Sequence, residues 1–282
     1  SYARQLPKKD CGIIERYTKE SGVRNLERCV TEICRKTAMQ ITTSADRVRN
    51  VVNGSNVESV LGVRKFLPDR IPAKDQIGLV NGLAWTSVGG ETLTVEVNVM
   101  DGSGKLELTG NLGDVMKESA HAALSYIRAN FTKLNVPADF YKTKDIHVHF
   151  PEGAVPKDGP SAGIAACTAM VSALTGVSVR SDVAMTGEIS IRGRVLPIGG
   201  LKEKTMAALR QGIRTVIIPK DNTRDLEEID QTVRSALNFV TAQSIETVLE
   251  TALNRKAALT APVLPELSGE MKNKSHKPDI RQ

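Results

Sequence analysis

The stretch PKDGPSAG, residues 156–163, determines how the rest of the sequence is interpreted. Its Gly and Pro content predicts a turn, and it runs directly into IAACTAMVSAL, residues 164–174, whose length and apolar composition predict a buried helix. Ser161 is therefore expected at a helix N-terminus, where unpaired backbone N–H groups and the positive end of the helix dipole can stabilise an oxyanion. Ser161 is also suited to capping that helix, and the local pattern alone favours the capping role.

A serine nucleophile needs a general base, and a lysine with a lowered pKa can serve. The stretch LPIGGLKEK, residues 196–204, places a double glycine before a predicted helix whose first turn contains Lys202 and Lys204. Positive side chains are electrostatically unfavourable there, which suggests a function, although solvated surface lysines are the simpler alternative. Two positions apart on a helix, the two side chains point about 200° apart, so at most one faces a site. Lys204 shares an inward stripe with Leu201 and Ala208, but apolar residues also flank Lys202.

Other reaction classes have weaker support. The sequence contains no phosphate-binding loop closed by Gly-Lys-Ser/Thr and no dinucleotide-binding glycine pattern, so we expect no ATP hydrolysis by these residues alone. His147 and His149 share one face of a predicted strand, which allows a metal site or a strand-surface or site-wall role. No third metal ligand lies within sequence reach, and a Ser-His-Asp triad would need one of these histidines beside a serine.

Hydrophobic periodicity predicts a mixed α/β (α+β) fold with a separate helical unit. Helical spacing covers residues 12–40 with a break at Ser21-Gly22, and a short helix is expected at 55–61. The expected strands are 93–99, entered through a turn at 88–91, then 105–109, 145–150, 183–186, 188–195 and 215–218; the expected helices are 112–134, 161–174, 201–212 and 245–253. We predict a helical unit at 1–67, a linker at 68–77, the α/β domain at 78–257 and a disordered tail at 258–282, which is rich in Pro, Lys and Ser.

Composition sets limits on the class of protein. Of 282 residues, 40% are apolar and 25% charged, which is ordinary for a globular protein, and aromatics at 4% leave the core to Val, Ile, Leu and Ala. Four cysteines without paired spacing predict neither a zinc site nor a disulfide framework. The charge of +6 favours a plain solvated surface over weak binding of nucleic acid.

The sequence shows no feature of a membrane or exported protein. No stretch approaches the roughly 18 to 20 apolar residues of a membrane helix, and the first residues lack a signal peptide's apolar segment. The absence of paired cysteine spacing favours a reducing compartment. The start without Met suggests a fragment of a longer chain.

Several motifs together resemble the proteolytic domain of Lon proteases. They are PKDGPSAG, MTGEI from Met185, RGRVLPIGGLKEK from Arg192 and VIIPKDN from Val216. The resemblance extends upstream through GLAWTSVGGETLTVE (82–96) and HVHFPEGAVPKDGPSAG (147–163) and covers residues 78–253. In addition, ERYTKESGVRNLERCVTEICRKTA (15–38) resembles the small helical subdomain that closes the AAA+ ATPase module of Lon.

The resemblance assigns roles to individual residues. It implies that Ser161 is the nucleophile and that Lys204, the second lysine of LKEK, is the base of a Ser-Lys dyad. In Lon relatives the position of Asp158 is associated with an inactive arrangement of the loop, that of Thr186 with a hydrogen bond near the lysine, and that of Trp85 with the substrate side. Arg24 resembles a sensor arginine that contacts nucleotide. The remaining expected supporting or substrate-side residues are Gly159, Pro160, Ala162, His147 and Glu188.

The implied activity is that of an ATP-dependent serine endopeptidase acting on unfolded, damaged or regulatory proteins. The implied assembly is a homo-oligomer, a hexameric ring in the full-length protein, which also uses ATP and Mg; no cofactor is expected for these residues alone. A bacterial cytoplasm is favoured because the matched stretches look more like bacterial Lon, with the mitochondrial matrix as the alternative. The rival interpretation is a catalytically idle Lon-like module that binds nucleic acid or a partner protein, and the intact Ser161 and Lys204 argue against it.

Overall fold

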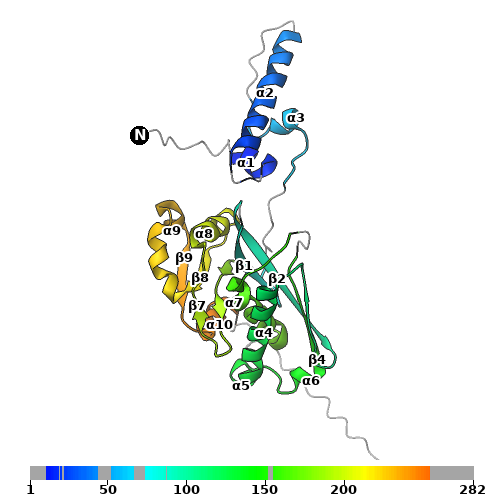
Figure 1. The fold of residues 1–282 in the computed structure, drawn as a ribbon, viewed down its shortest axis with the longest axis vertical. Helices are drawn as coiled ribbons and strands as arrows, with labels where there is room; N and C mark the ends of the chain where they lie inside the picture. The colour runs from blue at the N-terminus through cyan, green and yellow to red at the C-terminus, as the bar shows by residue number, and fades with distance from the viewer. Residues whose placement is uncertain are drawn as a thin grey trace, which may run out of the picture.

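A computed structural model describes residues 11–18, 20, 22–43, 52–66, 74–86, 88–151 and 155–254. These residues form a small helical unit and a larger α/β domain (Figure 1). The tail expected at 258–282 lies outside the described residues, as do residues 68–73 of the expected linker.

The helical unit contains α1 (Cys11–Tyr17), α2 (Arg24–Thr43) and α3 (Val57–Leu61). Tyr17, Cys29 and Val57 form its buried centre, and the Tyr17 hydroxyl donates a hydrogen bond of 2.8 Å to the carbonyl of Gly62. The two helices expected around Ser21-Gly22 are confirmed. The short third helix begins two residues later than expected, because residues 53–56 form a turn in which Val57 N–H bonds the carbonyl of Asn53.

The α/β domain is built on a seven-stranded mixed sheet with the strand order β3-β4-β2-β1-β5-β8-β9. The strands are β1 (Leu79–Thr86), β2 (Gly89–Asp101), β3 (Leu106–Thr109), β4 (Lys144–His149), β5 (Val183–Met185), β8 (Thr215–Pro219) and β9 (Asn238–Ala242). The pairs β1–β2 and β2–β4 are antiparallel and the other neighbours are parallel. A separate hairpin joins β6 (Glu188–Ile189) to β7 (Val195–Leu196).

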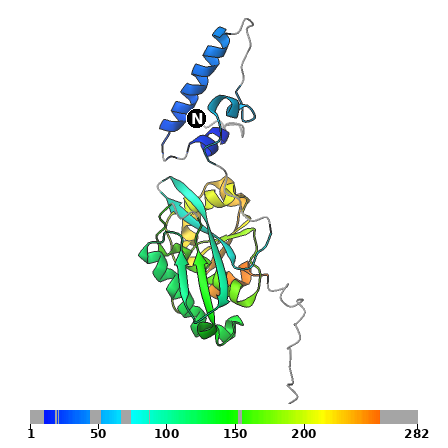
Figure 2. The same cartoon turned by 90° about the vertical axis from the view of Figure 1, so that its right-hand side faces the viewer.

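Helices cover both faces of this sheet (Figures 1 and 2). They are α4 (Asp114–Ala129), α5 (Phe131–Leu134), α6 (Phe140–Thr143), η1 (Pro160–Ala162), α7 (Gly163–Thr175), α8 (Leu201–Arg210), η2 (Lys220–Glu228), α9 (Gln231–Ala236) and α10 (Ile245–Ala252). Alternate residues of β8 separate two cores: Ile217 packs with α4, α7 and α10, whereas Val216 and Ile218 pack with α8 and α9. Helix α7 is buried on nearly every side, as its uninterrupted apolar sequence predicts.

Three sequence predictions need correction. The helix expected at 112–134 is interrupted at Asn130, whose φ of −126° is not helical, and so divides into α4 and α5. The single strand expected at 188–195 is wrong. Only the two ends of this segment are in strands, β6 and β7, and the chain turns between them at Gly193, whose φ is 79°. The turn expected at 88–91 is shorter, because β2 begins at Gly89.

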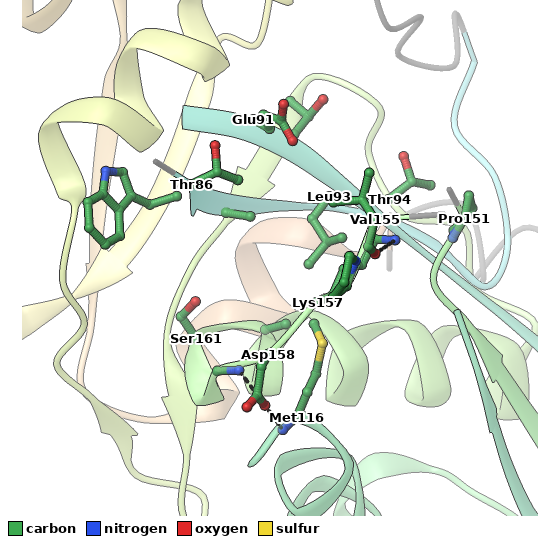
Figure 3. A pocket seen from close by; sticks show the side chains of 16 residues that line it. Thr86, Glu91, Leu93, Thr94, Met116, Pro151, Val155, Lys157, Asp158 and Ser161 are labelled. Atoms are coloured by element: carbon green, nitrogen blue, oxygen red, sulfur yellow. Dashed lines mark hydrogen bonds between the residues drawn. The ribbon is translucent and has the colours of Figure 1, made fainter. Parts of the chain in front are cut away.

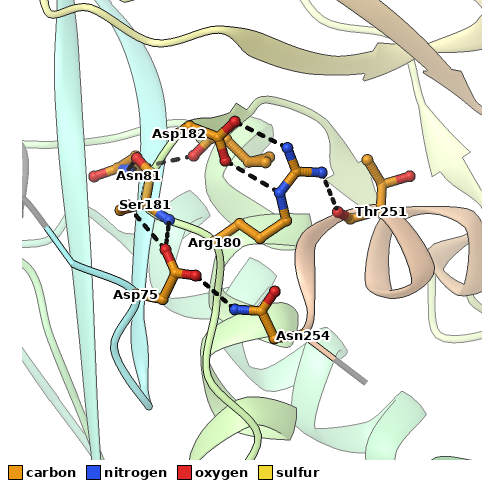
Figure 4. Close-up of polar contacts among 8 residues, drawn as sticks. Asp75, Asn81, Arg180, Ser181, Asp182, Thr251 and Asn254 are labelled. Atoms are coloured by element: carbon orange, nitrogen blue, oxygen red, sulfur yellow. Dashed lines mark hydrogen bonds and ion pairs between the residues drawn. The ribbon is translucent and has the colours of Figure 1, made fainter. Parts of the chain in front are cut away.

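The two ends of the α/β domain are tied together at one place (Figure 4). The Asp75 carboxylate accepts hydrogen bonds from the Ser181 N–H at 2.8 Å, the Ser181 hydroxyl at 2.9 Å and the Asn254 amide at 2.6 Å. Beside it, Arg180 donates to Asp182 at 2.9 Å and to the carbonyl of Thr251 at 3.3 Å. Asp75, which was expected in the linker, is therefore bonded into the α/β domain.

No helix among the described residues is both long and apolar enough to cross a lipid bilayer.

Candidate active site

A cavity of about 150 Å³ opens where β1 and β2 face the turn before α7 (Figure 3). Five of the residues singled out from the sequence line it: Trp85, Asp158, Gly159, Ser161 and Ala162. The lining also includes Glu91, Leu93 and Thr94 of β2, Met116 of α4 and Val155. Its lining mixes apolar side chains with the hydroxyl groups of Ser161 and Thr94 and the charged groups of Glu91, Lys157 and Asp158.

Ser161 lies in η1, a single 3-10 turn that precedes α7. Gly159 has φ of 127°, a conformation that only glycine adopts readily, and Pro160 starts the turn. Gly163 lets η1 approach its neighbours closely, since a Cβ there would lie 2.6 Å from Ser119 Oγ and 2.9 Å from the Ile189 nitrogen. The local sequence therefore places a half-buried serine at the cavity, just before the helix.

The helix-cap interpretation of Ser161 is wrong. The cap position of α7 is Ala162, that of η1 is Gly159, and neither has a side-chain cap hydrogen bond. The Ser161 carbonyl instead accepts the Gly187 N–H at 2.8 Å, which fixes the serine backbone against the segment that follows β5. The Ser161 hydroxyl has no capping role that would explain its position.

The two candidate lysines differ sharply in environment. Lys204 is only 3% exposed, whereas Lys202 is exposed. Helix α8 begins after Gly200, which adopts the left-handed conformation with φ of 69° and accepts the Lys204 N–H. Burial lowers the pKa of Lys204 to about 8 from its usual 10.5, because the charged ammonium loses its hydration. Lys204 is thus the lysine whose amine can be neutral near physiological pH.

Thr186 connects the buried lysine to the serine turn. The Lys204 Nζ donates to Thr186 Oγ1 at 3.0 Å, and Thr186 Oγ1 donates to the Ser161 carbonyl at 3.4 Å. Thr186 itself is fully buried, and its N–H bonds the carbonyl of Ile217 on β8. A side chain fixed by the central sheet therefore holds the lysine amine beside the serine turn.

Asp158 is bonded to α4 and its own loop. Its Oδ1 accepts the Met116 N–H at 3.2 Å, in the first turn of α4, and the Gly159 N–H at 2.9 Å. Gly113 makes room for this carboxylate, since a Cβ there would lie 2.3 Å from Asp158 Cγ. Asp158 thus supplies the N-terminal cap that α4 lacks in its own sequence. Across the described residues, no carboxylate forms an ion pair with Lys204.

Residues 51–255 match the family model of the Lon protease (S16) C-terminal proteolytic domain, and residues 11–49 match that of the Lon protease AAA+ ATPase lid domain. The chain belongs to the Lon protease family.

Bacterial Lon proteases are similar along most of the chain. A Lon protease of Finegoldia magna is 56% identical over 241 residues, which are 86% of this chain and 31% of the relative. The Lon protease of Escherichia coli K12 is 54% identical over 245 residues, 87% of this chain and 31% of the relative. Lon protease 1 of Bacillus subtilis 168 is 54% identical over 241 residues, 86% of this chain and 31% of the relative. The chain spans about a third of the length of these curated relatives.

The boundary between the helical unit and the α/β domain differs between the family match and the side-chain packing in the structure. The match begins at residue 51, whereas Val52, Val57 and Leu61 pack with Tyr17 and Cys29 of the helical unit. In the structure, residues 52–66 therefore belong with the helices that match the Lon lid.

The remaining predicted site residues lie at different distances from the cavity. Trp85 is 60% exposed on β1 and lines the cavity, and Pro160 starts the turn that contains Ser161. Glu188, on β6, follows Gly187, whose N–H holds the Ser161 carbonyl, but Glu188 does not line the cavity.

His147 is not brought to the site. It lies on β4, where its Nε2 is 2.8 Å from Thr109 Oγ1, and His149 Nδ1 is 2.7 Å from the same oxygen. Both histidines line a second cavity, bordered by residues 76–79 and 96–98. Within the part of the chain that the structure describes, no group of three His, Cys, Asp or Glu side chains is arranged to hold a metal. The two histidines therefore border this second cavity and do not line the one that contains Ser161.

The β2 and α4 residues of the wall were not predicted individually. Leu93 and Thr94 fall inside the matched stretch GLAWTSVGGETLTVE, which was the available signal. Met116 reaches the wall only because Asp158 binds the first turn of α4, a long-range contact that leaves no local pattern.

Proposed function

We propose that the chain is a serine endopeptidase with a Ser-Lys dyad, in which Ser161 is the nucleophile and Lys204 the general base. The observation that carries this proposal is the buried Lys204 amine bonded to Thr186 beside the serine turn. With a pKa of about 8, about half of the Lys204 amines are neutral at pH 8 and able to accept a proton.

Catalysis proceeds through an acyl-enzyme. Neutral Lys204 takes the proton of the Ser161 hydroxyl as Oγ attacks the peptide carbonyl carbon. Backbone N–H groups at the start of α7 stabilise the oxyanion, and the ammonium of Lys204 then returns the proton to the leaving amine nitrogen. Lys204 next takes a proton from a water molecule that attacks the ester carbonyl carbon. Its ammonium then gives this proton to Ser161 Oγ as the bond between Oγ and the acyl carbon breaks, which releases the acid product and restores the serine hydroxyl.

We assign the supporting residues by position. Thr186 orients the amine of Lys204. Gly159 and Pro160 shape the turn, and Ala162 leaves space for a substrate backbone beside the nucleophile. Trp85 contacts substrate from the β1 side.

For the complete protein we propose ATP-dependent degradation of unfolded, damaged or regulatory proteins. ATP and Mg²⁺ serve the AAA+ module, and residues 11–49 resemble the lid of that module. Arg24, the first residue of α2, is proposed as a nucleotide-sensing arginine. We propose a homo-oligomer, a hexamer in the complete protein, in the bacterial cytoplasm; the similar proteins named above are bacterial. The charge of +6 supports at most weak nucleic acid binding.

The test combines labelling with turnover. The chain is treated with a serine-directed covalent inhibitor, the modified residue is mapped by mass spectrometry, and hydrolysis of a fluorogenic peptide is followed in parallel. We expect modification at Ser161 and hydrolysis that is lost in Ser161→Ala. A folded chain that neither hydrolyses the peptide nor reacts at Ser161 would overturn the proposal.

A further inference from the structure

The tip of the β1–β2 hairpin lies directly against α8, the helix that contains Lys204 (Figures 1 and 2). Gly90 makes the closest approach: a Cβ there would lie 2.0 Å from the Glu203 carbonyl oxygen and 2.9 Å from the Lys204 nitrogen. Backbone therefore packs on backbone at the first turn of α8, with no space for a side chain or a water molecule between them.

A second contact lies at the start of α8. Trp85 is the cross-strand partner of Gly90, and a Cβ on Gly200 would lie 2.9 Å from Trp85 Cγ. The indole thus covers the residue whose carbonyl accepts the Lys204 N–H. The same hairpin tip touches both the cap position and the first turn of this helix.

A third contact comes from the last turn of α8. The Arg210 guanidinium donates a hydrogen bond of 2.7 Å from Nη2 to the carbonyl of Gly90. A guanidinium-to-carbonyl bond of this length is charge-assisted and stronger than a bond between neutral groups. Arg210 is exposed, so packing of its side chain in a core does not explain its orientation toward the hairpin.

We propose that Arg210 is a positioning residue for Lys204. By holding the hairpin tip against the first turn of α8, Arg210 shields the Lys204 amine from water and keeps it directed at Thr186. The inference rests on the proposed role of Lys204 as general base.

The physical consequence concerns the charge state of the amine. If Arg210 is lost, the hairpin tip separates more easily from α8 and water reaches Lys204, which stabilises the ammonium form. The neutral amine is then scarcer at a given pH. A rise of about half a unit in the Lys204 pKa would lower the neutral fraction about threefold at pH 7. A residue that only stabilised the fold would change the melting temperature without changing this titration.

The experiment measures the titration directly and through activity. The chain is labelled with ¹³Cε-lysine, the Lys204 signal is identified by its loss in Lys204→Arg, and its pKa is read from an NMR titration of the parent, Arg210→Ala and Arg210→Lys. The pH dependence of kcat/KM for a fluorogenic peptide is measured on the same proteins. Arg234→Ala is the matched control, because Arg234 is also an exposed arginine in the last turn of a helix, α9.

We expect the Lys204 pKa to rise by about half a unit or more in Arg210→Ala, with about a threefold or greater fall in kcat/KM at pH 7, and a smaller change in Arg210→Lys, which keeps a charged donor. Arg234→Ala should titrate as the parent does. If Arg210→Ala does not fold, Arg210→Met, which keeps much of the side chain but not the donor to the Gly90 carbonyl, decides the question in the same way. A parent-like Lys204 titration in the folded variants would overturn the inference, whereas an active Lys204→Ala would instead overturn the proposed function.

Discussion

Lys204 Nζ lies 3.0 Å from Thr186 Oγ1, so the buried amine at this site is bonded to a neutral hydroxyl. A buried ammonium normally pairs with a carboxylate, which would hold it charged and raise its pKa. A hydroxyl satisfies the hydrogen bond without favouring the charge to the same degree. The pairing of Lys204 with Thr186 therefore preserves the lowered pKa that a general base requires.

Thr186→Val should impair catalysis as well as stability. Valine keeps the shape of threonine but leaves the Lys204 amine without its bonded partner, a loss of about 1 to 3 kcal/mol for a buried polar group. We expect kcat/KM for a fluorogenic peptide to fall at least about tenfold, because the amine is no longer held in one orientation. Thr186→Ser keeps the hydroxyl and should retain most activity. Parent-like turnover in Thr186→Val would contradict this role.

Lys204→Met should abolish peptide hydrolysis as completely as Ser161→Ala, whereas Lys202→Ala should retain most of it. A nucleophile and its base act as a unit, so the double variant Ser161→Ala with Lys204→Met should be no worse than either single change. Lys202 is exposed on the same turn of α8 and is therefore the matched control. Steady-state kinetics on the folded variants decides the assignment. Loss of activity in Lys202→Ala with activity kept in Lys204→Met would reverse it.

The sequence predicts most of the elements that surround the site, because they are long or strongly apolar. Helix α7 and strand β8 are buried on both sides and read as continuous apolar segments. The elements that were missed lack such a signal: η2 is almost entirely polar, and β1 contains Asn81, which is buried only because its amide bonds the carbonyl of Ser181 at 3.1 Å. These elements depend on partners far away in the sequence.

The site was predictable to the extent that a local pattern encodes it. The turn around Ser161 and the helix start before Lys204 both have glycine and proline signatures. Strand periodicity correctly placed His147 and His149 on one face, but it does not give the order of the strands, and β2 lies between β4 and β1. The contact of Gly90 with α8 has no local signature, because it joins positions more than 110 residues apart.

Asp75→Asn should lower the melting temperature at neutral pH, by about a few degrees. The bonds from Ser181 and Asn254 hold the Asp75 pKa below its usual value of 3.8, so this carboxylate stabilises the fold at pH values above the ordinary pKa. The contribution shrinks as the pH falls below 3.8 toward the lowered pKa, so the melting temperatures of the parent and Asp75→Asn should approach each other. Thermal unfolding from pH 7 down to pH 3 checks this. Asp139→Asn, at another exposed aspartate, should match the parent throughout.

As the pH rises, Lys204 should increase peptidase activity, while the free-energy penalty of burying its side chain should decrease. The midpoint of the rise in kcat/KM with pH is expected near the Lys204 pKa of about 8. Below that pH the lysine is charged in both the folded and unfolded states, and the folded state bears the full penalty of burying the charge. Between about 8 and the usual value of 10.5 the unfolded chain binds more protons than the folded one, so the free energy of unfolding rises with pH.

Lys204→Met removes that penalty, so its free energy of unfolding at pH 7 should exceed that of the parent by up to about 3 kcal/mol. It should therefore unfold at a higher denaturant concentration. The difference should shrink as the pH rises above 8, because the parent then folds with a neutral amine. Chemical unfolding of the parent and Lys204→Met at pH 7, 8 and 9.5 measures the trend, and Lys202→Met, at an exposed position, should show no such dependence. A stability difference between parent and Lys204→Met that stays constant from pH 7 to 9.5 would mean that burial does not lower the pKa of this amine, and the general-base assignment would lose its physical support.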